Sequence, residues 1–380
     1  MQDIVAKMKT LLIIGGTGLL SGAVAKEAVN KGFDVTCINR GLHNPVAGTK
    51  VIVSDKDDYA KLKNELNGCF FDSVIDFLVR KDDELQRSFE FYSAYTNQYL
   101  FVSSTMIFNS SIDLIFEEDS PKVQEEWPYS KEKWECEKLL VELSKDSECH
   151  YTIIRPGITY DDTRIPYSVM PIYGQHWSLI ARMLEGKPIV AINAGMNKCN
   201  IMRVEDFAIG VVGLFGNKKA YDEAFNVCGD ESPSFCQVLD EVANIVGTKY
   251  QILGVSAQEY TKLVPNRKDE IIGRSFNYVC NNKKLKRIVP DFGSHISLHD
   301  GLSQVLKAYK ENNYYNGIDY AWDAECDKVA REKGWNTSHF IDYLHDASIQ
   351  DKLVYHKIMG NRYLYFYYRS LKKMCAILGF

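Results

Sequence analysis

The sequence predicts an α/β fold built on a doubly wound parallel sheet. Its first apolar run, residues 10–14, leads directly into glycines, and these lead into a helical pattern that ends near Gly32. A second strand-like run follows at residues 34–39. Strand, glycine turn, helix and strand in this order form the βαβ unit of a Rossmann-type dinucleotide-binding fold. Further strand-like runs that extend the same sheet occur at residues 51–55, 71–79 and 99–104.

The glycine turn has the spacing Gly15-x-x-Gly18-x-x-Ser21, with Gly22 beside the serine. Gly15 permits a tight turn, and Gly18 lets the backbone approach a pyrophosphate that the N–H groups of the helix from about Leu19 would bind. The alternative is a glycine-rich turn in a flavodoxin-like sheet that binds no nucleotide. The strand-helix-strand context favours the dinucleotide site.

Composition excludes several classes of protein. A chain of 380 residues that is 46% hydrophobic can form one large α/β domain and a smaller one. Its net charge of −5 argues against a protein whose main task is to bind nucleic acid. The ten cysteines form neither CxxC pairs nor metal spacings with histidine, so we expect no metal site and a reduced, cytoplasmic protein. We find no signal-like segment and no apolar run of the ~20 residues that a membrane span needs.

The end of the second strand bears on the choice of cofactor. A carboxylate there binds the ribose 2′-hydroxyl of NAD, and a cation accommodates the 2′-phosphate of NADP. This chain has Asn39 and Arg40 at that place and no acid, which favours NADP slightly over NAD. The alternative is a solvated Arg40 with NAD bound through neutral groups. Asp55, at the end of the third strand, could accept a hydrogen bond from adenine or could cap the next helix.

Hydroxyl residues end the strand expected at 99–104 and continue just beyond it. Ser103, Ser104 and Thr105 would lie at the carboxyl end of that strand, where open parallel sheets bind ligands. At least one of them could instead serve as a turn or N-cap residue.

Twenty-five positions after Ser104, Tyr129 and Lys133 have the i, i+4 spacing that places two side chains on one helix face. A neighbouring ammonium favours the phenolate and so lowers the pKa of a tyrosine towards the range useful for proton exchange. Tyr59 and Tyr368 also have a lysine four residues later. Only the Tyr129 pair follows both a glycine-rich βαβ unit and a serine-tipped strand.

The chain resembles the extended short-chain dehydrogenases/reductases, the superfamily of nucleotide-sugar epimerases, dehydratases and reductases. The resemblance covers residues 9–310 and rests on Gly15-Gly-Thr-Gly, on Phe101–Phe108, on Tyr129-x-x-x-Lys133 and on Ile154-Arg-Pro-Gly157. It implies that Ser104, Tyr129 and Lys133 are catalytic, and that a homodimer forms. The departures from the family pattern are Ser21 for the third glycine, Phe108 for a frequent tyrosine, and Arg40 for an acid.

The full set of expected cofactor contacts is Gly15, Thr17, Gly18, Leu19, Leu20, Asn39, Arg40, Asp55, Phe77, Leu78, Ser103, Tyr129, Lys133, Pro156 and Ile158. Aromatic and arginine residues after the Arg-Pro-Gly motif could stack on a base and neutralise the phosphates of a nucleotide-sugar. The expected substrate contacts are Thr105, Tyr160, Arg164, Tyr167 and Arg203. For any single tyrosine, simple packing in the small domain is the competing interpretation.

The expected domains are a dinucleotide-binding domain at 1–165 with about 195–230, a substrate domain at 166–194 with 231–310, and a helical extension at 311–380. If residues 362–380 are helical, Leu364, Tyr367, Leu371, Met374 and Leu378 share one side and Arg362, Arg369, Lys372 and Lys373 share the other. Such a helix could rest on anionic lipid as a peripheral contact, or could cover the body or a second subunit.

Two hypotheses of function follow. The first is an NAD(P)-dependent epimerase, dehydratase or reductase that acts on a sugar, with a nucleotide-linked substrate expected. The second is a catalytically silent NAD(P)-binding protein on the same fold, with a regulatory or RNA-binding role. The Ser/Tyr/Lys set and the acidic net charge favour the enzyme.

Overall fold

The computed structural model describes residues 8–111, 115–123, 127–166, 168–314, 317–337, 344 and 347–378. The chain divides into two compact units. Unit 1 comprises residues 1–161, 199–232 and 277–296. Unit 2 comprises residues 162–198, 233–276 and 297–380.

Unit 1 contains a seven-stranded sheet in the order β10-β6-β5-β4-β1-β2-β3, and every neighbouring pair is parallel. This confirms the predicted Rossmann-type, doubly wound α/β class. The strands are β1 (Thr10–Ile14), β2 (Asp34–Asn39), β3 (Lys50–Val53), β4 (Ser73–Asp76), β5 (Gln98–Val102), β6 (His150–Pro156) and β10 (Glu223–Val227). A small parallel pair, β7 (Ile158–Tyr160) and β9 (Ile201–Arg203), continues from the end of β6.

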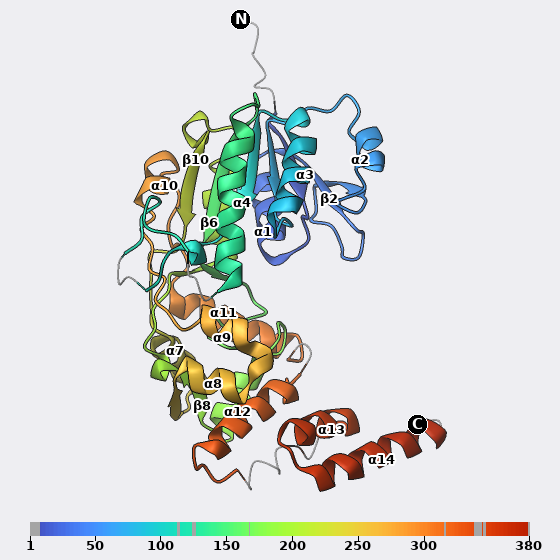
Figure 1. Cartoon of the computed structure of the whole chain (residues 1–380), viewed down its shortest axis with the longest axis vertical. Helices are drawn as coiled ribbons and strands as arrows, with labels where there is room; N and C mark the ends of the chain where they lie inside the picture. Colours follow the sequence, from blue (N-terminus) through green and yellow to red (C-terminus); the bar gives the residue numbers. More distant parts are fainter. Residues whose placement is uncertain are drawn as a thin grey trace, which may run out of the picture. The chain divides into compact units, whose positions relative to one another are not determined.

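Helices cover both faces of this sheet because successive strand residues point to opposite sides. Leu11 and Ile13 of β1 pack with α1 (Leu19–Asn30) and α6 (Val204–Val212) in one core. Leu12 and Ile14 pack in a second core with three other helices, α2 (Tyr59–Glu65), α3 (Asp82–Tyr92) and α4 (Pro128–Ser144). Figure 1 shows α3 and α4 side by side in front of the strands. The short helix α10 (Lys283–Ile288) contacts β10.

Unit 2 is mainly helical. Its one two-stranded sheet among the described residues pairs β8 (Ile189–Ile192) with β11 (Ile252–Val255) in parallel. Its helices are α5 (Trp177–Leu184), α7 (Phe235–Val246), α8 (Ala257–Leu263), α9 (Lys268–Gly273), α11 (Leu298–Glu311), α12 (Tyr320–Glu332), α13 (Ile349–Ile358) and α14 (Arg362–Leu378).

Two segments belong to other units than the sequence led us to expect. Residues 277–296 belong to unit 1, where Cys280 and Leu285 join its cores. The expected extension at 311–380 is part of unit 2, because buried ion pairs join α12 to α5 and to the residues before β8.

The last helix also differs from its expected amphipathic pattern. α14 packs along α13 (Figure 1). Leu364 and Leu371 are half-buried, but Tyr367 and Met374, which were expected on the same side, are exposed. Among the α14 residues whose side chains are described, one apolar face is therefore covered and a second is exposed. Within the described part of the chain, every helix is too short or too polar to cross a bilayer.

Candidate active site

The glycine turn joins β1 to α1 at the carboxyl edge of the sheet. Gly15 and Gly16 have positive φ angles of 118° and 88°. A Cβ atom on Gly16 would lie 2.6 Å from the Sγ atom of Cys37 on β2, so only glycine fits there. Ser21, which replaces the family's third glycine, is buried and its Oγ atom accepts a hydrogen bond from the Gly18 N–H at 3.0 Å. The serine therefore stabilises the turn in which it replaces the family's third glycine.

A cavity of about 530 Å³ opens beyond this turn, at the carboxyl ends of β1, β2, β3 and β4. In doubly wound sheets this edge is the general place for a ligand. Expected cofactor residues that line the cavity are Gly15, Thr17, Gly18, Asn39, Arg40, Asp55, Phe77 and Leu78. Leu19 and Leu20 form the first turn of α1 beside it. Residues that line the cavity but were not among the expected contacts are Ser21, Ile38, Leu42, His43, Ser54, Lys56, Asp57, Arg80 and Glu84.

Polar atoms at the edge of β2 and β3 fit a bound adenosine. The Oδ1 atom of Asn39 accepts a hydrogen bond from the Gly41 N–H at 2.9 Å. Among the described residues, the buried Asn39 Nδ2 and Ser54 Oγ atoms have no partner within the protein. Buried donors without partners are costly, and a ribose or a base would satisfy them. These residues therefore fit a dinucleotide.

Asp55 does not cap the helix after β3, which was one of its two expected roles. Its Oδ1 atom accepts a hydrogen bond from the Asp57 N–H at 3.0 Å, which shapes the loop after β3. Asp58 caps α2 instead, because its carboxylate accepts from the Lys61 N–H at 3.1 Å. Asp55 still lines the cavity, so a contact with adenine stays a prediction.

Asp76, at the end of β4, was not singled out from the sequence. Its carboxylate accepts hydrogen bonds from the Leu78 N–H at 2.7 Å and from the Ser88 hydroxyl at 2.6 Å. Burial raises the pKa of Asp76. The carboxylate thus holds the Phe77–Leu78 wall of the cavity in place. An acid that directly ends an apolar strand is the signal that could have found it.

Lys133 is buried on α4 and connects that helix to the sheet. Its Nζ atom donates to the carbonyl oxygens of Val79 at 2.8 Å and Val102 at 3.0 Å. Val102 ends β5, and Val79 lies three residues after β4. Burial lowers the pKa of Lys133. An ammonium has three N–H donors, so one remains beyond these two bonds.

Tyr129 lies one helical turn before Lys133, in the first turn of α4. Pro128 precedes it at a position where the absent N–H group costs nothing. The ring of Tyr129 packs 5.1 Å from that of Trp127, and 37% of its surface is exposed. The phenol is therefore accessible to a ligand.

The hydroxyl residues after β5 have three different surroundings. Ser104 caps the short helix at Thr105–Ile107, because its Oγ atom accepts a hydrogen bond from the Met106 N–H at 3.1 Å. Thr105 is buried and donates to the carbonyl of Pro156 at 3.1 Å. Ser103 is buried, and its Oγ atom has no partner among the described residues. Ser104 thus fulfils the expected capping role and retains its own proton for a ligand, and Thr105 supports the loop at Pro156.

Pro156 and Ile158 follow the end of β6. Pro156 is the last residue of β6, and the Ile158 N–H donates to the Asn200 carbonyl at 3.0 Å. Gly157 between them is confined, since a Cβ atom there would lie 3.0 Å from Cys228.

Two expected substrate residues meet inside unit 1. Tyr160 and Arg203 are buried at the ends of the paired strands β7 and β9, with the guanidinium 5.4 Å from the ring centroid. Arg203 also forms two hydrogen bonds of 3.0 Å with Glu205. Arg164 belongs to unit 2, where it bonds the Tyr173 hydroxyl at 2.7 Å. Tyr167 lies outside the described residues.

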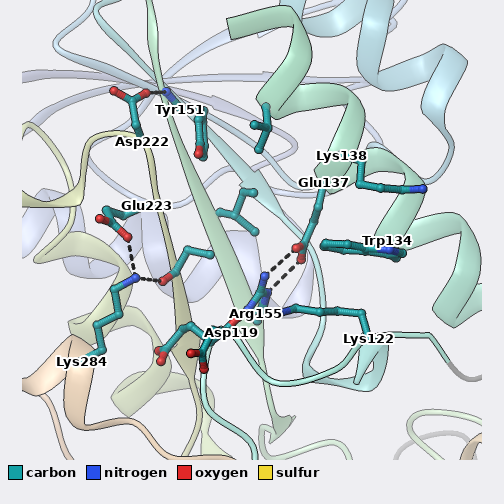
Figure 2. A pocket seen from close by; sticks show the side chains of 14 residues that line it. Asp119, Lys122, Trp134, Glu137, Lys138, Tyr151, Arg155, Asp222, Glu223 and Lys284 are labelled. Atoms are coloured by element: carbon teal, nitrogen blue, oxygen red, sulfur yellow. Dashed lines mark hydrogen bonds and ion pairs between the residues drawn. The ribbon is translucent and has the colours of Figure 1, made fainter. Parts of the chain in front are cut away.

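Arg155 of the Arg-Pro-Gly motif takes part in a separate feature. Its guanidinium forms hydrogen bonds of 3.0 and 2.7 Å with the carboxylate of Glu137 on α4, and both side chains are buried (Figure 2). It also donates to the Glu118 carbonyl at 2.7 Å. These residues line a second cavity of about 420 Å³, with Trp134, Tyr151 and Lys122 among its other walls. Arg155 therefore joins α4 to β6.

Glycine turn, cavity and buried lysine together define a Rossmann-type dinucleotide-binding protein. The chain matches the model of the NAD dependent epimerase/dehydratase family over residues 11–228, more than half of its length. It belongs to that family, and the resemblance noted in the sequence is confirmed at this level.

The chain is also similar to individual proteins. It is 28% identical over 247 residues to the chloroplast stem-loop binding protein of 41 kDa b of Arabidopsis thaliana, a match that spans 60% of each chain. It is 21% identical over 267 residues to dTDP-D-glucose 4,6-dehydratase of Mus musculus, covering 63% of this chain and 73% of the mouse protein.

Solved structures share the fold. The UDP-glucuronic acid 4-epimerase of Bacillus cereus, in complex with UDP-glucuronic acid and NAD, has a TM-score of 0.61 at 17% identity. The UDP-N-acetylglucosamine 4-epimerase of Methanobrevibacter ruminantium M1 has a TM-score of 0.64 at 16% identity. Each comparison covers 80% of this chain and 99% of the other.

Proposed function

We propose that this protein is an NAD(P)-dependent epimerase, dehydratase or reductase that acts on the sugar of a nucleotide-linked substrate. The observation that carries the proposal is the position of Lys133. This buried lysine ties the helix that presents Tyr129 to the carboxyl edge of the sheet, where the glycine turn and its cavity also lie. Relatives whose names state dTDP- or UDP-linked sugars support the substrate class.

The proposed mechanism assigns one task to each residue. A bound nicotinamide would supply the hydride acceptor and donor. Tyr129 exchanges a proton with a hydroxyl or carbonyl oxygen of the sugar. Ser104 donates its hydroxyl proton to the same oxygen. Lys133 uses its remaining N–H donor for the ribose, and its charge favours the phenolate of Tyr129.

The substrate contacts are part of the same proposal. Arg203 and Tyr160 of unit 1 would bind the phosphates and the base, and substrate contacts of Arg164 and Tyr167 stay predictions from the sequence. Thr105 would act mainly by holding Pro156, since its hydroxyl is already bonded to that carbonyl. Pro156, Ile158 and Ser103 would surround the nicotinamide amide. We also propose a homodimer, which sedimentation analysis would test.

Membership of the family does not decide between NAD and NADP as the preferred cofactor. We propose that NADP is accepted at least as well as NAD, because Arg40, His43 and Lys56 line the cavity and the end of β2 has no acid. Arg40→Ala should then weaken NADPH binding about tenfold more than NADH binding, because only NADPH has a 2′-phosphate. Equal losses in fluorescence titrations would contradict a role in 2′-phosphate recognition.

The test of function is a Tyr129→Phe variant. Wild-type protein is incubated with NAD or NADPH and a panel of UDP- and dTDP-hexoses, and products are identified by NMR. Loss of the general acid/base should lower turnover by at least about 100-fold. Tyr368→Phe is the matched control, because Tyr368 and Lys372 have the same spacing on α14. Near-normal turnover of Tyr129→Phe would remove Tyr129 from the mechanism.

A second candidate function is a catalytically silent, nucleotide-gated regulatory or RNA-binding protein. It is favoured by the name of the plant relative, which states stem-loop binding. Tight dinucleotide binding, no turnover of any sugar in the panel, and cofactor-dependent binding of a hairpin RNA would together support it. Turnover that depends on Tyr129 would exclude the silent form.

A further inference from the structure

Helix α14 exposes a second apolar face. Tyr363, Phe366, Tyr367 and Met374 are 91%, 55%, 56% and 53% exposed. Leu364, Tyr368 and Leu371 are partly buried instead, on the side where α14 packs along α13. Tyr368 stacks on His356 of α13 with the ring planes 3° apart. The four exposed residues, here called the α14 strip, are therefore left over after the helix has packed.

The α14 strip lies on one side of the helix, with the exposed Ser370 between Tyr367 and Met374. At about 100° per residue, its four members fall within an arc of roughly 100°. The outward-facing cations Arg362, Arg369 and Lys373 fall within an adjacent arc of roughly 40°. The helix therefore presents a row of large apolar side chains with a row of positive charges along one flank.

The charge of α14 is one-sided. The helix contains Arg362, Arg369, Lys372 and Lys373 and no acidic residue, within a chain of net charge −5. Lys372 is bonded to Gln350 of α13, which leaves the other three cations beside the strip. Large apolar side chains next to a basic flank are the composition of helices that lie in the plane of a membrane surface. Tyrosine in particular is enriched at that depth.

The charge of α14 also favours a membrane over other partners that could cover the α14 strip. A second copy of α14 packed on the strip would bring two sets of cations together with no acid between them, so self-association is disfavoured. An RNA would satisfy the cations but would leave Met374 and much of the strip in water. An anionic membrane satisfies both rows at once, because its headgroups attract the cations and its acyl region takes up the apolar side chains.

We propose that α14 docks the protein on anionic membrane surfaces, with the α14 strip inserted among the lipids and Arg362, Arg369 and Lys373 contacting the headgroups. The helix lies on the membrane and does not span it. This docking is independent of the proposed enzymatic activity.

The test is flotation of the full-length protein with vesicles. Binding to phosphatidylcholine–phosphatidylglycerol vesicles is expected, with roughly tenfold or greater weakening on pure phosphatidylcholine. Raising NaCl from roughly 0.05 to 0.5 M should weaken binding as the charges are screened. Phe366→Asp and the pair Arg369→Glu, Lys373→Glu should each weaken binding at least about tenfold.

Matched controls keep the test specific. Phe70 is 56% exposed in unit 1, so Phe70→Asp makes the same change elsewhere. Lys218→Glu with Lys219→Glu reverses two exposed charges of unit 1. Both controls should bind vesicles like the wild type, and all variants should retain wild-type circular dichroism.

Three outcomes would overturn the proposal. The first is no flotation with anionic vesicles, and the second is equal loss in the control variants. The third is a different occupant of the strip in the absence of vesicle binding. It would be seen as a dimer that dissociates in Phe366→Asp, or as hairpin-RNA binding that the same substitution abolishes.

Discussion

At the residue scale, the glycine turn depends on one close contact. Gly16 and Gly32 both have positive φ angles, 88° and 80°, but only Gly16 faces a neighbour, the Cys37 side chain. Gly32→Ala should cost about 1 kcal/mol of stability, from the left-handed backbone alone. Gly16→Ala should cost about 1–3 kcal/mol more, because Cys37 must move. Urea unfolding measures both; equal losses would show that the turn relaxes freely.

Lys122 has an unusual environment in the second cavity. Its amine donates to the Glu118 carbonyl at 2.8 Å and faces the ring of Trp134 at 5.7 Å (Figure 2). Burial and then the Arg155 guanidinium lower the pKa of Lys122 to about 8, and the nearby carboxylates of Glu137, Asp119 and Glu118 offset only part of this change.

This lowered pKa predicts a pH dependence of stability. Between pH 8 and the ordinary lysine value of 10.5, the unfolded chain holds a proton on Lys122 that the folded chain has lost. Stability therefore rises with pH through this window in the wild type, and Lys122→Met should lack that rise. Urea unfolding from pH 7 to 10.5 measures the difference, with Lys131→Met as the surface control. The prediction fails if the difference in free energy of unfolding between the wild type and Lys122→Met stays constant over this pH range.

The sequence anticipated cavity residues where a strand dictates their position. Asn39 ends β2, Arg40 follows it, and Asp55 lies two residues after β3. The carboxyl ends of parallel strands share one edge of the sheet. Arg80 and Glu84 also line the cavity. They were missed because the direction of a loop or helix side chain depends on packing that no local pattern encodes.

At the element scale, α4 is fixed to the sheet by two buried charges. Lys133 and Glu137 lie one turn apart. Lys133 donates to carbonyl oxygens near β4 and β5, and Glu137 pairs with Arg155 on β6. Tyr129 precedes them by a further turn on the same face. The helix that presents the proposed general acid/base is thus held at successive turns.

Breaking the Arg155–Glu137 pair tests this attachment. Arg155→Met leaves Glu137 buried without its cation and should cost about 3–5 kcal/mol, but Arg155→Met with Glu137→Leu should cost much less. Lys138→Met on the same helix breaks the exposed pair with Glu135 and should cost at most about 1 kcal/mol. Urea unfolding compares the three. A double variant no better than Arg155→Met would show that the pair stabilises beyond charge compensation.

The elements were predictable in proportion to their length. Helix α7 carries a period of buried apolar residues and a Ser234 cap, and both of these signals can be read from the sequence. The pair β7 and β9 was not foreseen, since strands of three residues carry too little pattern.

At the scale of the whole molecule, the C-terminal segment is joined to unit 2 by a buried charge cluster. Arg182 of α5 and Lys187 contact Asp323 and Asp327 of α12 at 2.6–2.9 Å, and the four side chains are fully buried. Tyr355 of α13 donates to Asp327 at 2.6 Å. Burial raises the pKa of Asp327, but the two cations outweigh this effect and hold it below its usual range. Sequence alone could not pair residues about 140 positions apart.

Two truncations separate this cluster from α14. A chain ending at residue 318 loses both aspartates, so Arg182 and Lys187 would be buried without partners; we expect it to misfold and aggregate, since an unpaired buried charge costs several kcal/mol. A chain ending at residue 361 keeps the cluster and loses only α14, so it should stay folded and keep wild-type turnover. Size-exclusion chromatography and thermal unfolding distinguish the two. A folded, monodisperse 1–318 chain would show that unit 2 does not need α12 and α13, and that the residues from 311 onward are a separable extension after all.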